Sequence, residues 1–291
     1  MAGTIMTQQS DKTQRLSNEQ FERYYRQILL TEVGEQGQHT LLDQHIIVVG
    51  TGGLGSHVAQ QLGAAGIGHL YLVDDDNVER SNLPRQILFD ETSIGQSKVL
   101  CVAKRIGASN SDLSVTDYCE RFTLEFADAL LHQNDGLQQA YLDNRLWVLD
   151  CTDNMSSRQT INAWCAQKFI GLVAASVTAF SGQLIVVNGK NNIQAGCYHC
   201  VFPDKNVIQD CANAGVLGPT VAVMASMQAL SIIKQILRIT PPDDQLHIFN
   251  AITLNWQSIF RHRDPQCPVC YHWDKQDTKK SSNHVSNEAI L

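Results

Sequence analysis

Short apolar runs alternate with amphipathic stretches through most of the chain. Four runs have the length and β-branched content of buried strands, namely residues 45–50, 69–74, 113–118 and 146–151. Between and after them, apolar residues recur at helical intervals in residues 54–65, 97–106 and 154–169. Strand and helix in alternation over this length predict an α/β fold with one doubly wound, Rossmann-like and mostly parallel sheet.

The two flanks of this core have patterns of their own. Ser17 is spaced from Gln20 as in a capping box, so it opens a predicted N-terminal helix. On the C-terminal side, residues 172–187 predict two strands joined near Ser181. Residues 214–238 predict a long helix and residues 246–260 a closing hairpin, so we expect a C-terminal antiparallel extension of the sheet.

The polar ends of the chain lack any periodic pattern. Residues 1–16 and 271–291 are therefore predicted to be disordered tails. Residues 17–270 show no internal repeat and are expected to form a single domain.

One long stretch, residues 216–233, carries no charged side chain and approaches the length that crosses a bilayer. A membrane span and a helix buried in a core or subunit interface are both compatible with that length. Gly218, Pro219 and Gln228 lower its hydrophobicity and Lys234 follows at once, so the buried helix is favoured.

Composition narrows the classes of function. The chain has 291 residues, of which 43% are hydrophobic and 18% charged, which is enough apolar material for a full core. Its 22 basic and 29 acidic side chains give a net charge of -7, which argues against nucleic acid as a main partner. Nine cysteines, an odd number, behind a polar N-terminus predict a reducing, cytoplasmic location.

A glycine-rich segment follows the first predicted strand and opens the next predicted helix. Gly50, Gly52, Gly53 and Gly55 permit a tight turn and close backbone approach, while amides at a helix start attract phosphate. Asp74 ends the second strand about 20 residues further on, where a carboxylate accepts hydrogen bonds from ribose hydroxyls. These features predict an adenine nucleotide and leave NAD and ATP open.

Charged residues beyond the glycine segment favour ATP. Arg85 follows the second strand, Lys98 lies near a helix start, and Asp153 follows another strand. A diphosphate is already stabilised by loop amides, whereas a triphosphate needs further cations and usually magnesium. Because parallel strands end at one edge of the sheet, Asp74 and Asp153 should face one crevice, with Asp153 holding Mg²⁺. Taken singly, Arg85 and Lys98 would be solvated surface charges and Asp153 a helix N-cap.

Two CxxC pairs, Cys197 with Cys200 and Cys267 with Cys270, supply the ligand set of a tetrahedral structural zinc. Two redox motifs are the alternative, but neither pair has the helix-start context that lowers a thiol pKa. His199 is then a spacer. We expect four other cysteines, Cys101, Cys119, Cys151 and Cys165, to be buried in the core.

The motifs GTGGLGS (50–56), LVDDDNVERSNLPRQ (72–86), GQSK (95–98) and DCTDN (150–154) occur in this order. With RYYRQILL (23–30) and CANAGVLGP (211–219), the chain resembles the ThiF/MoeB family of E1-like adenylyltransferases from about Phe21 to Cys270. The resemblance implies that residues 17–270 are one E1-like adenylation domain. The ATP-binding residues that it implies are Gly50, Gly52, Gly53, Gly55, Asp74, Asn82, Arg85, Gln86, Lys98, Asp153 and Asn154.

Two further residues take their roles from the resemblance. Arg26 corresponds to the arginine that family members place in the neighbouring subunit's ATP site, which implies a symmetric homodimer. Cys211 corresponds to a cysteine that can handle the activated carrier; otherwise it is a small apolar filler.

The reaction that the resemblance implies is adenylation of the C-terminal glycine of a ubiquitin-like sulfur carrier protein. The carboxylate attacks the α-phosphate of ATP, giving acyl-AMP and pyrophosphate, and needs no general base because it is already ionised. The sequences of these motifs are more similar to those of the thiamine branch of the family, and the molybdopterin branch is the alternative. No rhodanese-like segment is present, so a separate protein is expected to donate sulfur. An NAD-dependent oxidoreductase and a non-catalytic, zinc-stabilised scaffold are the rival classes.

Overall fold

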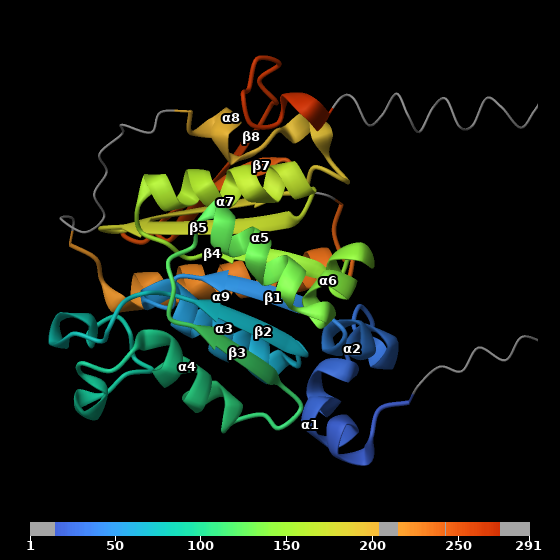
Figure 1. The fold of residues 1–291 in the computed structure, drawn as a ribbon, viewed down its shortest axis with the longest axis vertical. Coiled ribbons are helices and arrows are strands. Elements are labelled where there is room, and N and C mark those ends of the chain that lie inside the picture. Colours follow the sequence, from blue (N-terminus) through green and yellow to red (C-terminus); the bar gives the residue numbers. More distant parts are fainter. Residues whose placement is uncertain (1–14, 204–214, 242, 274–291) are drawn as a thin grey trace, which may run out of the picture.

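The computed structural model describes residues 15–203, 215–241 and 243–273. An eight-stranded sheet forms its centre, in the order β3-β2-β1-β4-β5-β6-β7-β8 (Figure 1). Four neighbouring pairs, from β3 to β5, are parallel, and the remaining pairs are antiparallel. The strands are β1 (His45–Val49), β2 (His69–Val73), β3 (Ser114–Tyr118), β4 (Leu146–Asp150), β5 (Gly171–Thr178), β6 (Ser181–Val187), β7 (Gln245–Asn250) and β8 (Asn255–Phe260). The predicted doubly wound sheet with an antiparallel extension is confirmed.

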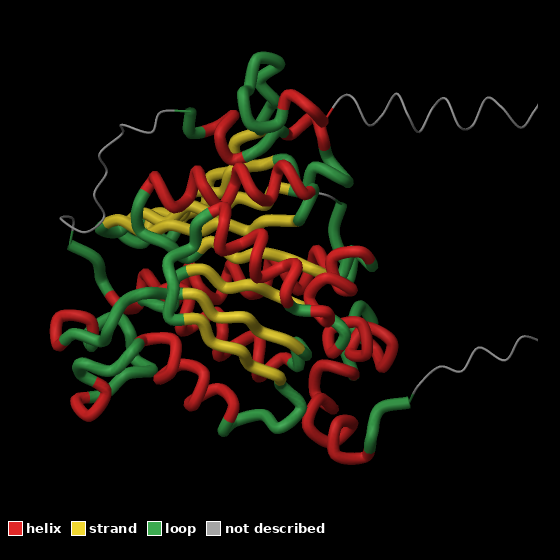
Figure 2. Tube along the Cα trace, in the orientation of Figure 1, coloured by secondary structure: helices red, strands yellow, loops and turns green. Residues whose placement is uncertain are grey.

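Helices cover both faces of the sheet (Figures 1 and 2). One face packs against α3 (Gly53–Ala65), α4 (Lys98–Gly107) and α9 (Gly218–Ile236). The other packs against α5 (Leu124–Gln133), α6 (Asp135–Leu142) and α7 (Met155–Lys168). The remaining helices are α1 (Asn18–Ile28), α2 (Gly34–Leu42) and the short α8 (Tyr198–Val201). Of these helices, α2, α5, α6 and α8 were not expected from the hydrophobic pattern.

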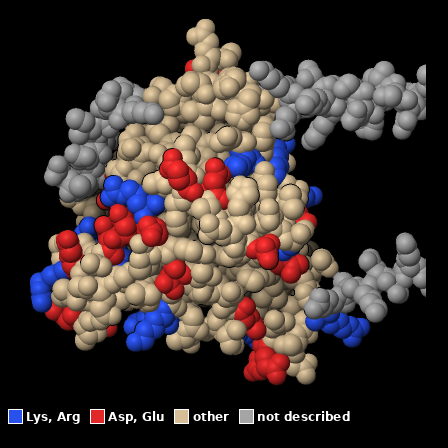
Figure 3. All heavy atoms as spheres, viewed as in Figure 1, with Lys and Arg blue, Asp and Glu red and all other residues tan. Residues whose placement is uncertain are grey.

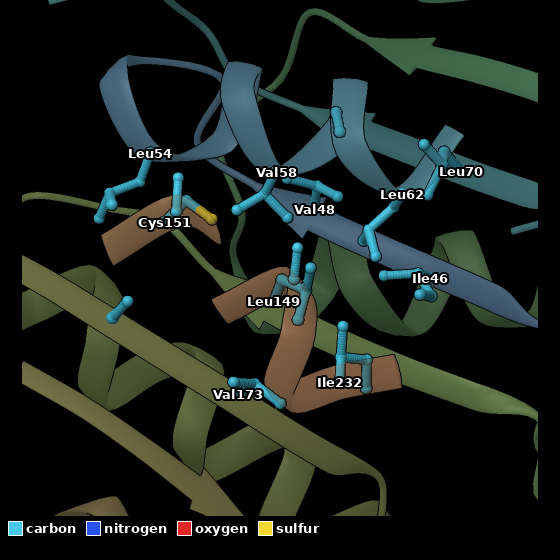
Figure 4. Close-up of a cluster of buried hydrophobic side chains, with 14 of the residues drawn as sticks. Ile46, Val48, Leu54, Val58, Leu62, Leu70, Leu149, Cys151, Val173 and Ile232 are labelled. Atoms are coloured by element: carbon cyan, nitrogen blue, oxygen red, sulfur yellow. The ribbon is translucent and has the colours of Figure 1, made fainter. Parts of the chain in front are cut away.

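Alternation along the strands divides the core in two. In β1, Ile46 and Val48 belong to the cluster under α3 and α9, whereas Ile47 and Val49 belong to the cluster under α5 and α7. Figure 4 shows Val58 of α3 directed at the first of these clusters. Since both faces of the parallel strands are covered, their sequences are continuously apolar.

The charge-free stretch forms α9, which packs against α3, β5 and β6. Gln228 is fully buried in it and donates from Nε2 to the carbonyl oxygens of Asp150 (3.0 Å) and Val173 (2.9 Å). Its place in the core agrees with the favoured interpretation. Across the described part of the chain, every helix is too short or too polar to cross a bilayer.

Several boundaries differ from the predictions. Ser17 caps α1 with the expected capping box. The turn between β5 and β6 lies at residues 179–180, just before the predicted Ser181. Trp273 falls within the predicted C-terminal tail, yet it is 1% exposed and its Nε1 donates to the Ala166 carbonyl oxygen at 3.0 Å. Most of both predicted tails, residues 1–14 and 274–291, lies outside the described residues.

The expectation that four further cysteines lie in the core is only partly right. Cys151 and Cys165 are buried, but Cys101 is half-buried and Cys119 is exposed. Cys119 follows the edge strand β3, where its Sγ lies 3.0 Å from Ser97 Oγ. An edge strand is covered less completely than a central one, which explains this error.

Candidate active site

A cavity of about 1390 Å³ opens where β1, β2 and β4 end. β1 has β2 on one side and β4 on the other, so this is the point at which successive crossovers leave in opposite directions. Most of the nucleotide-binding residues expected from the sequence line it: Gly50, Gly52, Gly53, Asp74, Asn82, Arg85, Gln86, Lys98, Asp153 and Asn154. Figure 3 shows basic and acidic side chains gathered side by side at this end of the molecule.

The glycine turn brings β1 close to the end of β4. Gly50 has a φ of +84°, and a Cβ there would lie 2.9 Å from the carbonyl oxygen of Cys151. A Cβ at Gly55 would lie 1.8 Å from the carbonyl oxygen of Gly50. Gly55 is not part of the cavity lining, so its place in the motif is explained by the packing of α3 against the turn.

Asp74 holds the glycine turn against the end of β2. Its Oδ2 accepts hydrogen bonds from the backbone N–H (2.6 Å) and the hydroxyl (3.1 Å) of Thr51. Its Oδ1 accepts one from the backbone N–H of Asp76 at 2.9 Å. Burial raises the pKa of Asp74, and the amide donors and the charge of Lys98 oppose that rise. Asp74 therefore orders the loop as well as lining the cavity.

Two basic residues predicted from the sequence, Lys98 and Arg85, line the cavity. Lys98 is 7% exposed at the first position of α4, and its Nζ lies 2.7 Å from Asp76 Oδ2. Arg85 is half-buried and donates from Nη1 to the carbonyl oxygen of Ser81 at 2.9 Å. Lys98 is thus no solvated surface charge, and the cavity has a fixed cation on its wall.

Asp153 and Asn154 divide the roles that sequence analysis left open. Asn154 Oδ1 accepts the backbone N–H of Ser157 at 2.9 Å, so Asn154 is the N-cap of α7. Asp153 is exposed on the cavity wall and has no hydrogen-bond or ion-pair partner in residues 15–203, 215–241 and 243–273. A carboxylate with available oxygens is the type of ligand that Mg²⁺ uses beside substrate phosphates, so the side chain fits that ion.

A buried arginine that was not predicted from the sequence, Arg158, also lines the cavity. Arg158 is 5% exposed and donates to the carbonyl oxygens of Thr152 and Ala175. Burial raises the pKa of the fully buried Asp150, and the positive charge of Arg158 opposes that rise. A basic residue one helical turn after the N-cap was visible in the sequence, but its inward direction depends on the packing of α7.

The loop from β3 to α5 was also missed. Residues 120–125, which end this loop and begin α5, line the cavity. Glu120 and Arg121 of the loop and Glu125 in the first turn of α5 place charges of both signs there. Because α5 was not predicted, nothing in the sequence analysis directed attention to the residues before it.

Of two further predicted site residues, one lies away from the cavity lining and the other is not among the described residues. Arg26 is exposed on α1 and does not line the cavity. The same helix and the turn after it expose an apolar stripe, formed by Phe21, Tyr25, Leu29 and Leu30. Cys211 lies outside the described residues.

The four cysteines of the CxxC pairs come together in one cluster. Their Sγ atoms all lie within 4.8 Å of one another. Cys197 is 4.0 Å from Cys200 and 3.7 Å from Cys267, while Cys200 is 3.5 Å from Cys270. A tetrahedron with Zn–S bonds of about 2.3 Å has sulfur separations of about 3.8 Å, so the cluster fits zinc.

Protons are shared unequally within this cluster. Hydrogen bonds from Cys197 and Cys270 lower the pKa of Cys200, and the bond to Cys200 raises the pKa of Cys197. Four thiols at this spacing need a cation in order to ionise together. His199 is a spacer as expected, because its Nδ1 lies 3.0 Å from Gln159 Oε1 and outside the cluster.

Known proteins share both the sequence and the architecture of this chain. The family model described as "ThiF family" matches residues 24–269. The chain belongs to the ThiF family. It is 40% identical over 256 residues to the sulfur carrier protein ThiS adenylyltransferase of Escherichia coli (strain K12), covering 88% of this chain and 97% of that protein. The predicted resemblance is therefore confirmed, and this relative's name matches the predicted class, a nucleotidyltransferase.

A second ThiF-family relative is longer. The chain is 37% identical over 260 residues to the adenylyltransferase and sulfurtransferase MOCS3 of Bos taurus, covering 88% of this chain and 54% of that protein. It thus spans about half of MOCS3. A crystal structure of E. coli MccB with MccA-N7isoASN aligns with a TM-score of 0.68 at 22% identity, covering 85% of this chain and 74% of that one. This alignment supports the fold alone.

Proposed function

We propose that this chain transfers AMP from ATP to the C-terminal glycine of a ubiquitin-like sulfur carrier protein and releases pyrophosphate. One observation carries the proposal: a single cavity brings together the glycine turn, the cations Arg85 and Lys98, and the available carboxylate of Asp153. The adenylyltransferase relative agrees with this chemistry.

The cavity suits a triphosphate better than a dinucleotide. The turn before α3 offers backbone N–H groups and the positive end of a helix dipole to one part of the phosphate chain. Arg85 and Lys98 add positive charge that a diphosphate bound at the turn does not require. The volume of about 1390 Å³ exceeds the roughly 300–1,000 Å³ of a typical small-molecule pocket, which leaves room for a polypeptide tail.

Lys98 would change partner when the nucleotide binds. Its Nζ bonds Asp76, whose side chain is 65% exposed and free to turn to water. A triphosphate oxygen competes well for the ammonium group because it carries more charge than a carboxylate oxygen. Lys98 and Arg85 then stabilise the negative charge that develops as pyrophosphate leaves.

The attacking group needs positioning more than activation. A terminal carboxylate is ionised at neutral pH and attacks the α-phosphorus directly, so the phosphoanhydride bond to pyrophosphate breaks as the acyl-phosphate bond forms. The loop amides and the two cations hold the phosphates in line for this attack. Mg²⁺ held at Asp153 would supply further neutralisation of phosphate charge.

The thiamine-type carrier is the proposed substrate. The similarity to the ThiS-activating relative extends over 97% of that protein, which favours this branch. The second candidate is the molybdopterin-type carrier, which the motif analysis keeps as its alternative. We further propose that a separate protein donates sulfur and that Cys211 handles the activated carrier.

A homodimer completes the proposed site. Arg26 is exposed away from the cavity of its own chain, on a helix whose apolar stripe lies open to solvent. A second copy packed on this stripe would bring Arg26 to the phosphates of the neighbouring cavity. A guanidinium there would stabilise charge in the same way as Arg85.

ATP–pyrophosphate exchange with purified thiamine and molybdopterin carriers tests the proposal. We expect exchange that depends on magnesium and on a carrier, and that is faster with the thiamine carrier. Faster exchange with the molybdopterin carrier would reverse the branch. An absence of exchange with both would contradict adenylation, and a melting temperature raised by NAD but not by magnesium-ATP would favour the oxidoreductase.

A further inference from the structure

We propose that Asn162 is a positioning residue of the four-cysteine centre and sets how tightly that centre holds its metal. Asn162 lies in the middle of α7 and is fully buried. Its Nδ2 donates to Cys197 Sγ at 3.6 Å, and its Oδ1 accepts the backbone N–H of Tyr198 at 2.9 Å. This inference concerns the metal centre alone and does not depend on the proposed adenylation.

The two contacts fix the direction of the amide. Since the backbone N–H of Tyr198 can only donate, the side-chain oxygen of Asn162 must face it. The NH₂ group must then face Cys197, so it is oriented to donate a hydrogen bond to the ligand sulfur. A buried amide with both ends used in this way keeps one orientation when the metal binds or leaves.

An N–H donor matters here because the centre gathers negative charge in a buried place. Four thiolates around one divalent cation leave a net negative group, and each hydrogen bond to sulfur lowers the cost of burying it. Arg261, which is 5% exposed, adds a fixed charge that acts on Cys197 and Cys200. Its guanidinium donates only to carbonyl oxygens among the described residues, those of Val186, Ala195, Gly196 and Asp243.

At three successive turns, helix α7 bonds the segments that surround the centre. Gln159 donates from Nε2 to the carbonyl oxygen of Phe202 at 2.5 Å. One turn later Asn162 reaches Cys197, and after another turn the carbonyl oxygen of Ala166 accepts from Trp273 Nε1. Of these three contacts, only that of Asn162 ends on a ligand sulfur.

The variant Asn162→Asp separates the donor from the acceptor. A carboxylate keeps an oxygen for the Tyr198 N–H but has no hydrogen to donate to Cys197. Gln159→Glu is the matched control, because it makes the same amide-to-carboxylate change on the same helix, at a side chain that bonds the Phe202 carbonyl oxygen and His199 Nδ1 but no ligand sulfur. Both changes place one additional negative charge on α7.

Zinc affinity and the rate of zinc release to a chelator should be measured on the full chain, together with the thiolate-to-cobalt charge-transfer band after Co²⁺ substitution. We expect Asn162→Asp to weaken zinc binding by about 10- to 100-fold and to shift the band. Gln159→Glu should leave both close to those of the unaltered protein.

Two results would overturn the proposal: unchanged zinc affinity in Asn162→Asp, or an equal loss in Asn162→Asp and Gln159→Glu. If Asn162→Asp does not fold, Asn162→Ser decides by the same measurements. Its hydroxyl is too short to keep the sulfur contact and carries no charge, so unchanged zinc release in that variant contradicts the role and faster release supports it.

Discussion

At the scale of single residues, the carboxylates and amides around the cavity have two roles. Some bond the backbone and hold it in place, and one has oxygens that a ligand can use. The oxygens of Asp74 bond the backbone of the glycine turn, and Asn154 caps α7. Asp153 lines the same cavity, and its oxygens are available among the described residues. A site that binds phosphate and metal needs side chains of both kinds, because those that bond the backbone keep the ligand-binding carboxylate in position.

Asp153→Asn tests the proposed metal ligand. Neutralising this carboxylate should lower ATP–pyrophosphate exchange by about 10²–10³-fold, because the charge on the phosphates is no longer balanced. Its melting temperature should stay unchanged, since the side chain holds no part of the described fold. Asp135→Asn, an exposed position outside the cavity, is the control. Full exchange in the Asp153 variant would exclude a magnesium role.

Gly55→Ala tests the packing of α3 on the turn. The new methyl group would overlap the carbonyl oxygen of Gly50, so we expect a loss of about 3 kcal/mol or more in the free energy of unfolding. Gly107→Ala, at the end of α4 with open space around it, should instead gain roughly 0.5–1 kcal/mol. Denaturant unfolding of both variants measures this, and a neutral Gly55→Ala would contradict the geometry.

At the scale of elements, two imidazoles join the starts of β1 and β2. His45 and His69 are paired in the parallel register, and their rings stack with centroids 4.0 Å apart. His45 Nδ1 lies 3.0 Å from the Tyr71 hydroxyl. Burial lowers the pKa of His45 to about 4, and the charge of His69 contributes to this decrease. The pKa of His69 is lowered as well, chiefly by burial.

The lowered pKa values of these two histidines predict that the folded protein loses stability as the pH falls. Between pH 6.5 and about 4 the unfolded chain binds more protons than the folded one at His45, so stability present above pH 6.5 falls as the pH decreases. The loss should be on the order of 2 kcal/mol. His45→Gln keeps a polar group for Tyr71 but does not titrate, so its unfolding free energy should vary less over this range. An identical pH dependence in both proteins would refute this origin.

The four-cysteine centre joins segments that are distant in sequence, so metal removal should loosen a whole region. Cys197 is the N-cap of α8 and Cys200 lies within that helix, whereas Cys267 and Cys270 follow β8. Chelation of the metal should lower the melting temperature clearly, because ligand binding to the folded state is also folding free energy. Calorimetry with and without chelator measures this, and Cys267→Ser should reproduce the chelated value. An unchanged transition would contradict a structural metal.

Elements differ in how well the sequence predicts them. The central strands β1, β2, β4, β5 and β6, together with α3, α4, α7 and α9, have continuous or periodic apolar patterns, because these elements pack in the core on both faces of the sheet. By contrast, α2 begins at Gly34 and contains Gly37, which lowers its intrinsic helix preference. α5 and α6 meet at Asn134, which ends one helix and caps the next, so their pattern reads as interrupted.

The residues of the candidate site also differ in how well the sequence predicts them. Residues directly after strands were predictable, because parallel strands deliver their carboxyl ends to one edge. The bond between Asp74 and Thr51 and the inward direction of Arg158 were not, since each depends on how separate elements pack. The distance between Arg26 and its own cavity likewise appears only once α1 is placed in the fold.

At the scale of the whole molecule, the proposed dimer can be tested by mixing two inactive variants. Arg26→Ala lacks the donated arginine and Asp153→Asn lacks the magnesium ligand. In a mixed dimer, the cavity that keeps Asp153 receives Arg26 from the other subunit and is intact. Random reassembly at equal concentrations should restore about a quarter of the unaltered exchange rate. If the mixture is no more active than its components, Arg26 does not act across a dimer.

The most direct measurement is the intact mass of the carrier after incubation with this chain and magnesium-ATP. We predict a thiamine-type carrier with one AMP added through its terminal carboxylate, formed together with pyrophosphate, and no addition to the same carrier without its last glycine. An unmodified carrier under conditions where ATP is bound, or AMP added equally to the shortened carrier, would contradict acyl adenylation by this protein.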